Sequence, residues 1–323
     1  MRKLQFTVVA LLMVLAAAVV GVPMFAQAPA AVPAPAAVRV DIGGDWAVTI
    51  SEDQPHRAPG PELGDYTGLP LNDAARQKAE AWDATILSQP ERQAQAHPAQ
   101  YWMRGPGPAL RILRILSPVT QQHFAYTIAG GFGRADRIVY IDGRNHPSDY
   151  SEHTWDGYST GRWDQNGQFL ITTTHMKYGV IQRNGSPASP YTVMTEHFTR
   201  HGLYMMLFTW LDDPIYLEEP MVRTHNWTWN PGGNMGLGNA FESVDELGDR
   251  PLGWVPFFAL GTRQTEYGEM HNLPFKVTQG GKESLYPEYM TKIAQFRVEE
   301  AAAQAAEEAK KAAAAAAAAP RRR

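Results

Sequence analysis

The sequence contains no cysteine among its 323 residues. This absence excludes disulfide bridges, thiolate catalysis and a lipid carried on a cysteine. The stability of the folded chain must therefore come from the burial of apolar side chains, and the chain is long enough to build a sizeable core.

The sequence also lacks a large excess of charge of either sign. It has 29 lysines and arginines against 33 aspartates and glutamates, which gives a formal net charge of −4. The body of the chain carries no basic stripe, and such a stripe is the usual electrostatic footprint of nucleic-acid binding. We therefore expect no nucleic-acid partner.

A long hydrophobic run occurs near the start of the sequence, at residues 6–22. It follows Arg2 and Lys3 and precedes the small residue Ala26, which is the layout of a secretory signal peptide. The run is shorter than the roughly 20 residues that span a bilayer. The sequence predicts a signal peptide over 1–26 and a periplasmic or secreted protein without stable membrane insertion after cleavage. An uncleaved anchor is the alternative.

Composition divides the remaining chain into three parts. Residues 27–40 are rich in proline and alanine and predict an extended linker, and 41–296 predict a single β-rich domain with an irregular C-terminal wrap. Residues 297–323 form an alanine-rich, charged tail that ends in three arginines. The tail is expected either to touch anionic envelope surfaces or to have no partner.

Few segments have the pattern of a helix. Asn72 or Asp73 can cap one over 74–88, and 282–295 is a second candidate. Most other segments are rich in β-branched and aromatic residues and are separated by glycine, proline or asparagine. Strands are expected at 45–51, 110–116, 123–129, 137–142, 155–163, 168–175, 191–200, 203–211 and 215–226.

Short connections between these segments predict antiparallel pairing, with the clearest hairpin turn at Asn166-Gly167. A meander of this length must close or curl to protect its edges. The predicted fold is mainly β, an antiparallel barrel or strongly curled sheet with one or two flanking helices. The Gly44-Asp45-Trp46 opening is similar to the start of lipocalin-like barrels in architecture.

Residues 157–161 fit the G-x-S-x-G pattern of a nucleophile elbow, with Ser159 at its centre. An elbow requires a helix directly after the serine, whereas a hairpin turn and a β-branched segment follow here. We therefore interpret Ser159 as a strand residue and the flanking glycines as marks of close backbone approach.

His197 and His201 have the spacing of two zinc ligands on one helical face. Their flanks are β-rich, and Gly202 places His201 at a turn. The sequence therefore predicts no metal site here, and we found no pattern that indicates another cofactor.

Charged and imidazole side chains are dense between Tyr140 and Trp163. Such a group could form a structural latch, in which Arg144 pairs back to Asp142, or a ligand site. The residues assigned to ligand binding under the second interpretation are Asp142, Arg144, His146, His153, Trp155, Tyr158 and Trp163. The catalytic candidates are His146 with Asp142 or Glu152 as acid and base.

Three segments have a distinctive sequence: "IDGRNHP" from Ile141, "GYSTGRW" from Gly157 and "DDPIYLEEP" from Asp212. With these motifs the chain resembles, over most of 41–290, a family of exported bacterial proteins of unknown function. It implies export and brings no activity with it.

Three functions remain open at this point. The leading hypothesis is an exported, barrel-like protein that binds a small, partly apolar molecule or an envelope component. The second is a hydrolase or isomerase that uses the 142–156 loop, and the third is a structural envelope protein.

Overall fold

The computed structural model describes residues 38–49, 61–89, 92, 95–104, 109–130, 136–233, 251, 254–255 and 257–318. The chain divides into two compact units, Met1–Ala36 and Ala37–Arg323. The predicted signal peptide, most of the predicted linker and the three terminal arginines lie outside the described residues.

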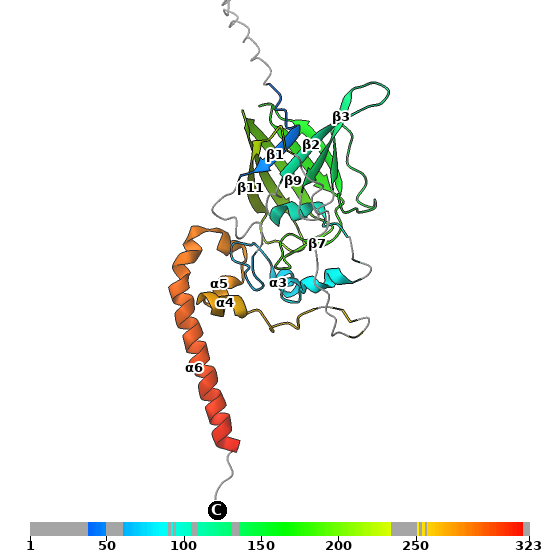
Figure 1. Cartoon of the computed structure of the whole chain (residues 1–323). Helices are drawn as coiled ribbons and strands as arrows, with labels where there is room; N and C mark the ends of the chain where they lie inside the picture. The colour runs from blue at the N-terminus through cyan, green and yellow to red at the C-terminus, as the bar shows by residue number, and fades with distance from the viewer. Residues whose placement is uncertain are drawn as a thin grey trace, which may run out of the picture. The chain divides into compact units, whose positions relative to one another are not determined.

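Nine strands form a closed β-barrel, which confirms the predicted fold class (Figure 1). Around the barrel the order is β1-β11-β10-β9-β6-β5-β4-β3-β2. The strands are β1 (Gly44–Val48), β2 (Ala109–Leu116), β3 (His123–Gly130), β4 (Arg137–Tyr140), β5 (Tyr158–Trp163), β6 (Phe169–Thr174), β9 (Val193–His201), β10 (Tyr204–Asp212) and β11 (Met221–Trp229). Each overlaps one of the nine segments expected from the sequence.

The barrel is mixed rather than wholly antiparallel. β4 and β5 run parallel, with Val139 opposite Ser159 and Tyr140 opposite Thr160. Parallel neighbours need a long crossover connection, and here the segment 141–157 supplies it. The densely charged loop singled out in the sequence is therefore this crossover.

The last barrel strand begins later than the sequence suggests, at Met221 instead of residue 215. Asp213 causes the difference, because its Oδ1 accepts hydrogen bonds from the backbone N–H groups of Ile215 and Tyr216. The chain consequently turns at 213–217 before it enters β11.

β1 closes the barrel by pairing with strands from both ends of the domain. Trp46 lies opposite Trp229 of β11 on one side and opposite Leu110 of β2 on the other. Alternate residues along the strands point inward and are buried, as in Phe169 and Ile171 of β6. The interior is therefore a packed core of side chains.

A small two-stranded ribbon and a short helix lie against each other beside the barrel strands. The ribbon is formed by β7 (Gly179–Val180) and β8 (Pro187–Ala188). The 3₁₀ helix η3 (Ala99–Arg104) contacts β7, and its Trp102 ring meets the inward Trp227 ring edge-on, with centroids 6.4 Å apart. Residue 102 therefore covers part of the barrel interior.

Four α-helices lie within the described residues: α3 (Asp73–Glu80), α4 (Glu266–His271), α5 (Phe275–Thr278) and α6 (Ile293–Ala318). Asn72 caps α3 by accepting a hydrogen bond from the Ala75 N–H. The described residues also form the 3₁₀ helices η1 (Ala84–Ser88), η4 (Lys282–Leu285) and η5 (Pro287–Lys292).

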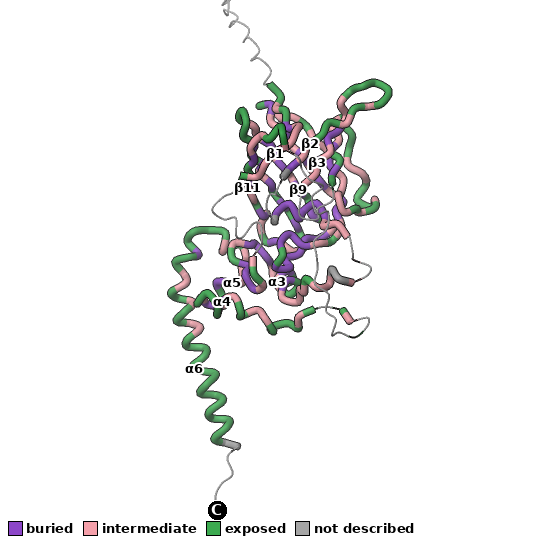
Figure 2. The backbone as a smooth tube through the Cα atoms, viewed as in Figure 1, coloured by how far each residue is buried: buried purple, intermediate pink, exposed green. Residues whose placement is uncertain are grey.

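The part of the chain expected to form an irregular C-terminal wrap contains α4 and α5, and its residues 234–250, 252–253 and 256 lie outside the described residues. The alanine-rich end of α6 is exposed, as the green tube in Figure 2 shows. No helix in the described part of the chain is both long and apolar enough to cross a membrane.

Candidate functional site

Asp142 and Arg144 form an ion pair at the start of the crossover. The Arg144 Nη2 lies 2.6 Å from the Asp142 Oδ2, and about a third of each side chain is exposed. The Arg144 guanidinium also lies over the Tyr140 ring, 3.7 Å from its centroid. The hydrogen bonds from Arg144 lower the pKa of Asp142. The contact is the one that the latch interpretation anticipated.

His146 lies on the outer wall of the barrel between two threonine hydroxyls. Its Nδ1 is 2.8 Å from Thr174 Oγ1 and its Nε2 is 2.8 Å from Thr160 Oγ1. Burial, followed by the charge of His175, lowers the pKa of His146. The imidazole is thus held by β5 and β6, and neither Asp142 nor Glu152 is its hydrogen-bond partner.

His153 packs against the segment that follows β6. Its Nδ1 lies 2.9 Å from the Met176 carbonyl oxygen, and its ring is 5.2 Å from that of His175. Glu152 beside it is exposed. The predicted acid and base groups therefore do not converge on one point, and their catalytic role stays a prediction.

The three aromatic members of the predicted set lie in three different places. Tyr158 packs on the outer wall against Tyr140, with ring centroids 5.6 Å apart. Trp163 packs against Phe169 and donates a hydrogen bond to the Val40 carbonyl. Trp155 lines a surface cleft. Ligand binding by the complete predicted set stays a prediction.

Ser159 lies inside β5, in agreement with its interpretation as a strand residue. It is buried, and its Oγ is 2.8 Å from Thr173 Oγ1. Gly161 is required for packing, because a Cβ there would lie 2.4 Å from the Phe169 ring. The glycines of the motif therefore allow β5 and β6 to pack closely.

His197 lies inside the strand β9, as its flanks predicted, whereas His201, expected in the turn, is the last residue of that strand. Across the described residues, no group of three or more histidine, aspartate or glutamate side chains is arranged to hold a metal ion.

The barrel interior contains an ion pair that sequence reasoning missed. Arg137 of β4 donates to both carboxylate oxygens of Glu196 of β9, at 2.6 and 2.8 Å, and to Thr173 Oγ1 at 3.2 Å. Both charged side chains are fully buried. The alternation of side chains along β9 could have indicated it, because Glu196 falls on the same face of the strand as the apolar residues Met194 and Phe198.

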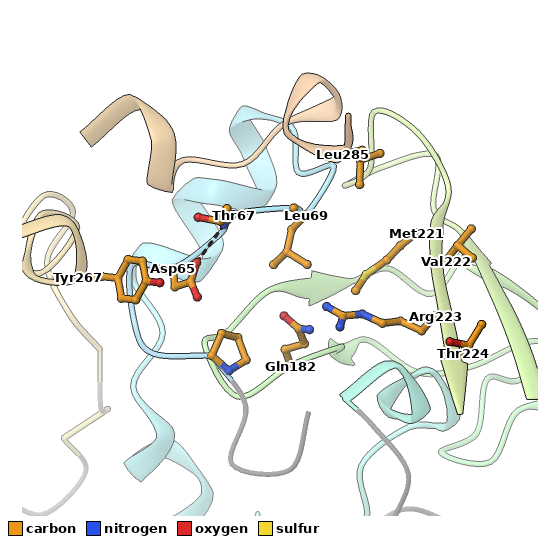
Figure 3. Close-up of a pocket in the computed structure, with 12 residues that line it drawn as sticks. Asp65, Thr67, Leu69, Gln182, Met221, Val222, Arg223, Thr224, Tyr267 and Leu285 are labelled. Atoms are coloured by element: carbon orange, nitrogen blue, oxygen red, sulfur yellow. Dashed lines mark hydrogen bonds between the residues drawn. The ribbon is translucent and has the colours of Figure 1, made fainter. Parts of the chain in front are cut away.

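A cavity of about 540 Å³ lies beside the first half of β11 (Figure 3). Its apolar lining includes Leu69, Met221 and Leu285. Its polar lining includes Asp65, Gln182, Arg223 and Tyr267. We call this the β11 cavity.

The polar groups of the β11 cavity enter from opposite sides. In Figure 3 the Arg223 side chain extends from β11 toward the amide of Gln182, and the Tyr267 ring lies next to Asp65. Asp65 accepts a hydrogen bond from the Thr67 N–H at 3.1 Å. Burial, together with the nearby carboxylates, raises the pKa of Tyr267 to about 12, so its hydroxyl stays neutral near pH 7.

Backbone contacts hold the loops that form this cavity. The buried Asn184 donates from its amide to the Asp65 carbonyl at 2.7 Å, which joins the loop before β8 to the loop before α3. Arg223 lies opposite Thr209 of β10, which is buried in the barrel. Residue 223 therefore belongs to the set of β11 residues that face the barrel interior. The cavity thus borders the barrel interior.

These features define the class of the protein as a closed, mixed β-barrel with an ion pair inside and a cavity of mixed polarity beside one strand. Comparisons of the chain with protein-family models, with curated proteins and with solved structures gave no match.

Proposed function

We propose that the protein is an exported β-barrel that binds a small, partly apolar molecule in the β11 cavity. The observation that carries this proposal is the convergence of Arg223, Gln182 and Asp65 on a cavity with an apolar lining. A volume of about 540 Å³ lies within the range of small-molecule sites, which combine an apolar lining with few polar groups.

The two polar sides of the cavity indicate the chemistry of the ligand. Arg223 and the Gln182 amide suit a carboxylate or another group rich in acceptors. Asp65 and the neutral Tyr267 hydroxyl suit a hydroxyl or an ammonium group. Leu69 and Met221 would contact the apolar part between them. The expected ligand is therefore an amphiphilic acid small enough for one cavity.

The first 26 residues favour export. The charged start, the apolar run at 6–22 and the small residue at 26 support a cleaved signal peptide. The resemblance to exported bacterial proteins agrees with this placement, and the absence of cysteine leaves no residue for a lipid anchor. The mature protein would then meet its ligand outside the cytoplasm.

The first test is native mass spectrometry of protein purified from its own export compartment, followed by titration with decanoate and with decanol. We expect a retained molecule, and decanoate should bind at least tenfold more tightly than decanol. Arg223→Met should lose the retained molecule and this preference, since the cation is replaced by an apolar side chain of similar length.

The control is Arg162→Met, because Arg162 is exposed on the outer face of β5. It should behave like the wild type. Equal retention by the Arg223 variant, or equal affinity for the acid and the alcohol, would reject this cavity as the site.

A further inference from the structure

A second cleft, of about 470 Å³, lies between the segment before η3, the crossover before β5 and the ribbon strand β7. Three large aromatic side chains line it: Trp82, Trp155 and Tyr178. The two tryptophans are half-buried, and 43% of Tyr178 is exposed. The cleft therefore presents aromatic surface at a position that water reaches. We call it the tryptophan cleft.

The walls of this cleft are fixed by short contacts. The Ala99 N–H donates to the Trp155 carbonyl at 2.8 Å, and the Gln100 side chain donates to the Lys177 carbonyl at 2.9 Å. At position 185 only glycine fits, because its φ is +83° and a Cβ would lie 2.2 Å from the Trp82 side chain. The backbone at Trp155 and Lys177 and the packing around Trp82 are thus fixed before any ligand arrives.

The charge of the tryptophan cleft is of one sign. Its lining contains the two cations Arg92 and Lys177 and no carboxylate. Lys177 lies over the Trp155 ring, 5.1 Å from its centroid, and neither it nor Arg92 has an ion-pair partner in the part of the chain that the structure describes. The cleft therefore favours an anion.

Tyr178 adds a neutral donor to this cleft. Burial raises its pKa to about 12, with the nearby Tyr216 acting in the same direction and Arg92 opposing it. The phenol keeps its proton near pH 7. Together with the side chains of Gln95 and His97 it can form hydrogen bonds with the hydroxyl groups of a ligand.

We infer that the tryptophan cleft binds an acidic sugar ring, with its C–H face on Trp155 and its carboxylate at Lys177 and Arg92. A pyranose carries an apolar C–H face that packs on an aromatic ring, and its hydroxyl groups keep the opposite side in water. This fits a cleft whose aromatic groups are only half-buried. A carboxylate on the sugar ring would form charge-assisted hydrogen bonds with Lys177 and Arg92. A neutral sugar would leave these two cations without a counter-ion.

Isothermal titration calorimetry on the full chain tests this inference with glucuronate, glucose and benzoate. Glucuronate should bind at least tenfold more tightly than either of the others, since only it has both a sugar face and a carboxylate. Lys177→Gln should reduce glucuronate affinity at least tenfold and leave glucose unchanged. Lys310→Gln, on the exposed part of α6, is the matched control and should have no effect.

The aromatic contribution is tested separately. Trp155→Leu should weaken glucuronate and glucose alike, and circular dichroism checks that the variant is folded. If it is not, Tyr178→Leu at its exposed position provides the same test. A glucuronate trimer that binds more tightly than the monomer identifies a polymeric glycan as the source, and equal affinity identifies the free sugar.

Three results would overturn the inference: no binding of glucuronate, equal affinity for glucose and glucuronate, or tighter binding of benzoate. Arg223→Met should leave glucuronate affinity unchanged, because Arg223 lines the other cavity. The tryptophan cleft and the β11 cavity can therefore succeed or fail independently.

Discussion

Two ion pairs in this protein have the same shortest contact distance and opposite surroundings. Arg137 and Glu196 approach to 2.6 Å inside the barrel with no exposed surface, and Asp142 and Arg144 approach to 2.6 Å on the crossover with about a third of each side chain exposed. Contact distance alone therefore says little about energy. Water weakens the outer pair, whereas the inner charges are shielded from water and each depends chiefly on its partner for stabilisation.

The two pairs also differ in what they connect. Asp142 and Arg144 are two residues apart, so their contact organises one loop. Arg137 and Glu196 are 59 residues apart, on strands β4 and β9 that are not neighbours in the sheet. Their contact crosses the interior and fixes two parts of the barrel wall relative to each other. The inner pair is therefore tied to the closed fold itself.

The largest expected effect comes from breaking the inner pair. Arg137→Met should lower the free energy of unfolding by about 3–5 kcal/mol, because the carboxylate of Glu196 would remain buried without a cation. Urea unfolding followed by tryptophan fluorescence measures the loss. The exposed Arg162→Met is the control and should change stability by less than about 0.5 kcal/mol.

The double variant Arg137→Met with Glu196→Leu sharpens this test. Removing both charges removes the unpaired ion, so most of the lost stability should return. A double variant no more stable than the single one would show that packing around residue 137, and not charge pairing, dominates at this position.

Much of the barrel could be predicted because its signals are local. Segments rich in β-branched and aromatic residues, separated by glycine, proline or asparagine, predicted all nine strands. Asn166-Gly167 marked the hairpin between β5 and β6, where Gly167 has φ +77°. The parallel contact of β4 with β5 has no local signal. It depends on where the crossover packs, which is decided by contacts such as those of His146 with Thr160 and Thr174.

The cavities were harder to predict for the same reason. Asp65, Gln182, Arg223 and Tyr267 come from four segments far apart in the sequence and meet only because the barrel closes. The sequence instead drew attention to the charged crossover, where the density of charge is visible without a fold. Of that group, only Trp155 lines one of the cavities described here.

A smaller effect is expected from the outer pair. Arg144→Ala should cost about 0.2–1 kcal/mol, since both groups are solvated and a surface pair gains little. Chemical unfolding at low and high salt measures it, and the difference from the wild type should shrink as salt screens the pair. A loss as large as that of Arg137→Met would contradict the contrast between exposed and buried pairs.

The smallest effect concerns pH and His146. Its pKa in the folded protein is lowered, first by burial and then by His175, while the unfolded chain has the ordinary value near 6.5. Between these two values the unfolded state binds more protons, so acid favours unfolding. The contribution of His146 to the free energy of unfolding is fully present above about pH 6.5, the pKa in the unfolded chain. It decreases as the pH falls below this value and is lost once the pH is below the pKa in the folded protein.

His146→Asn should therefore flatten the fall in unfolding free energy between pH 6.5 and more acidic values, measured by urea titrations at each pH. The exposed His201→Asn is the control and should keep the wild-type slope. His123, whose pKa burial also lowers, leaves a residual slope in both variants. An unchanged slope in the His146 variant would contradict this prediction. It would show that Thr160 and Thr174 bind the charged imidazole of His146 as well as the neutral one.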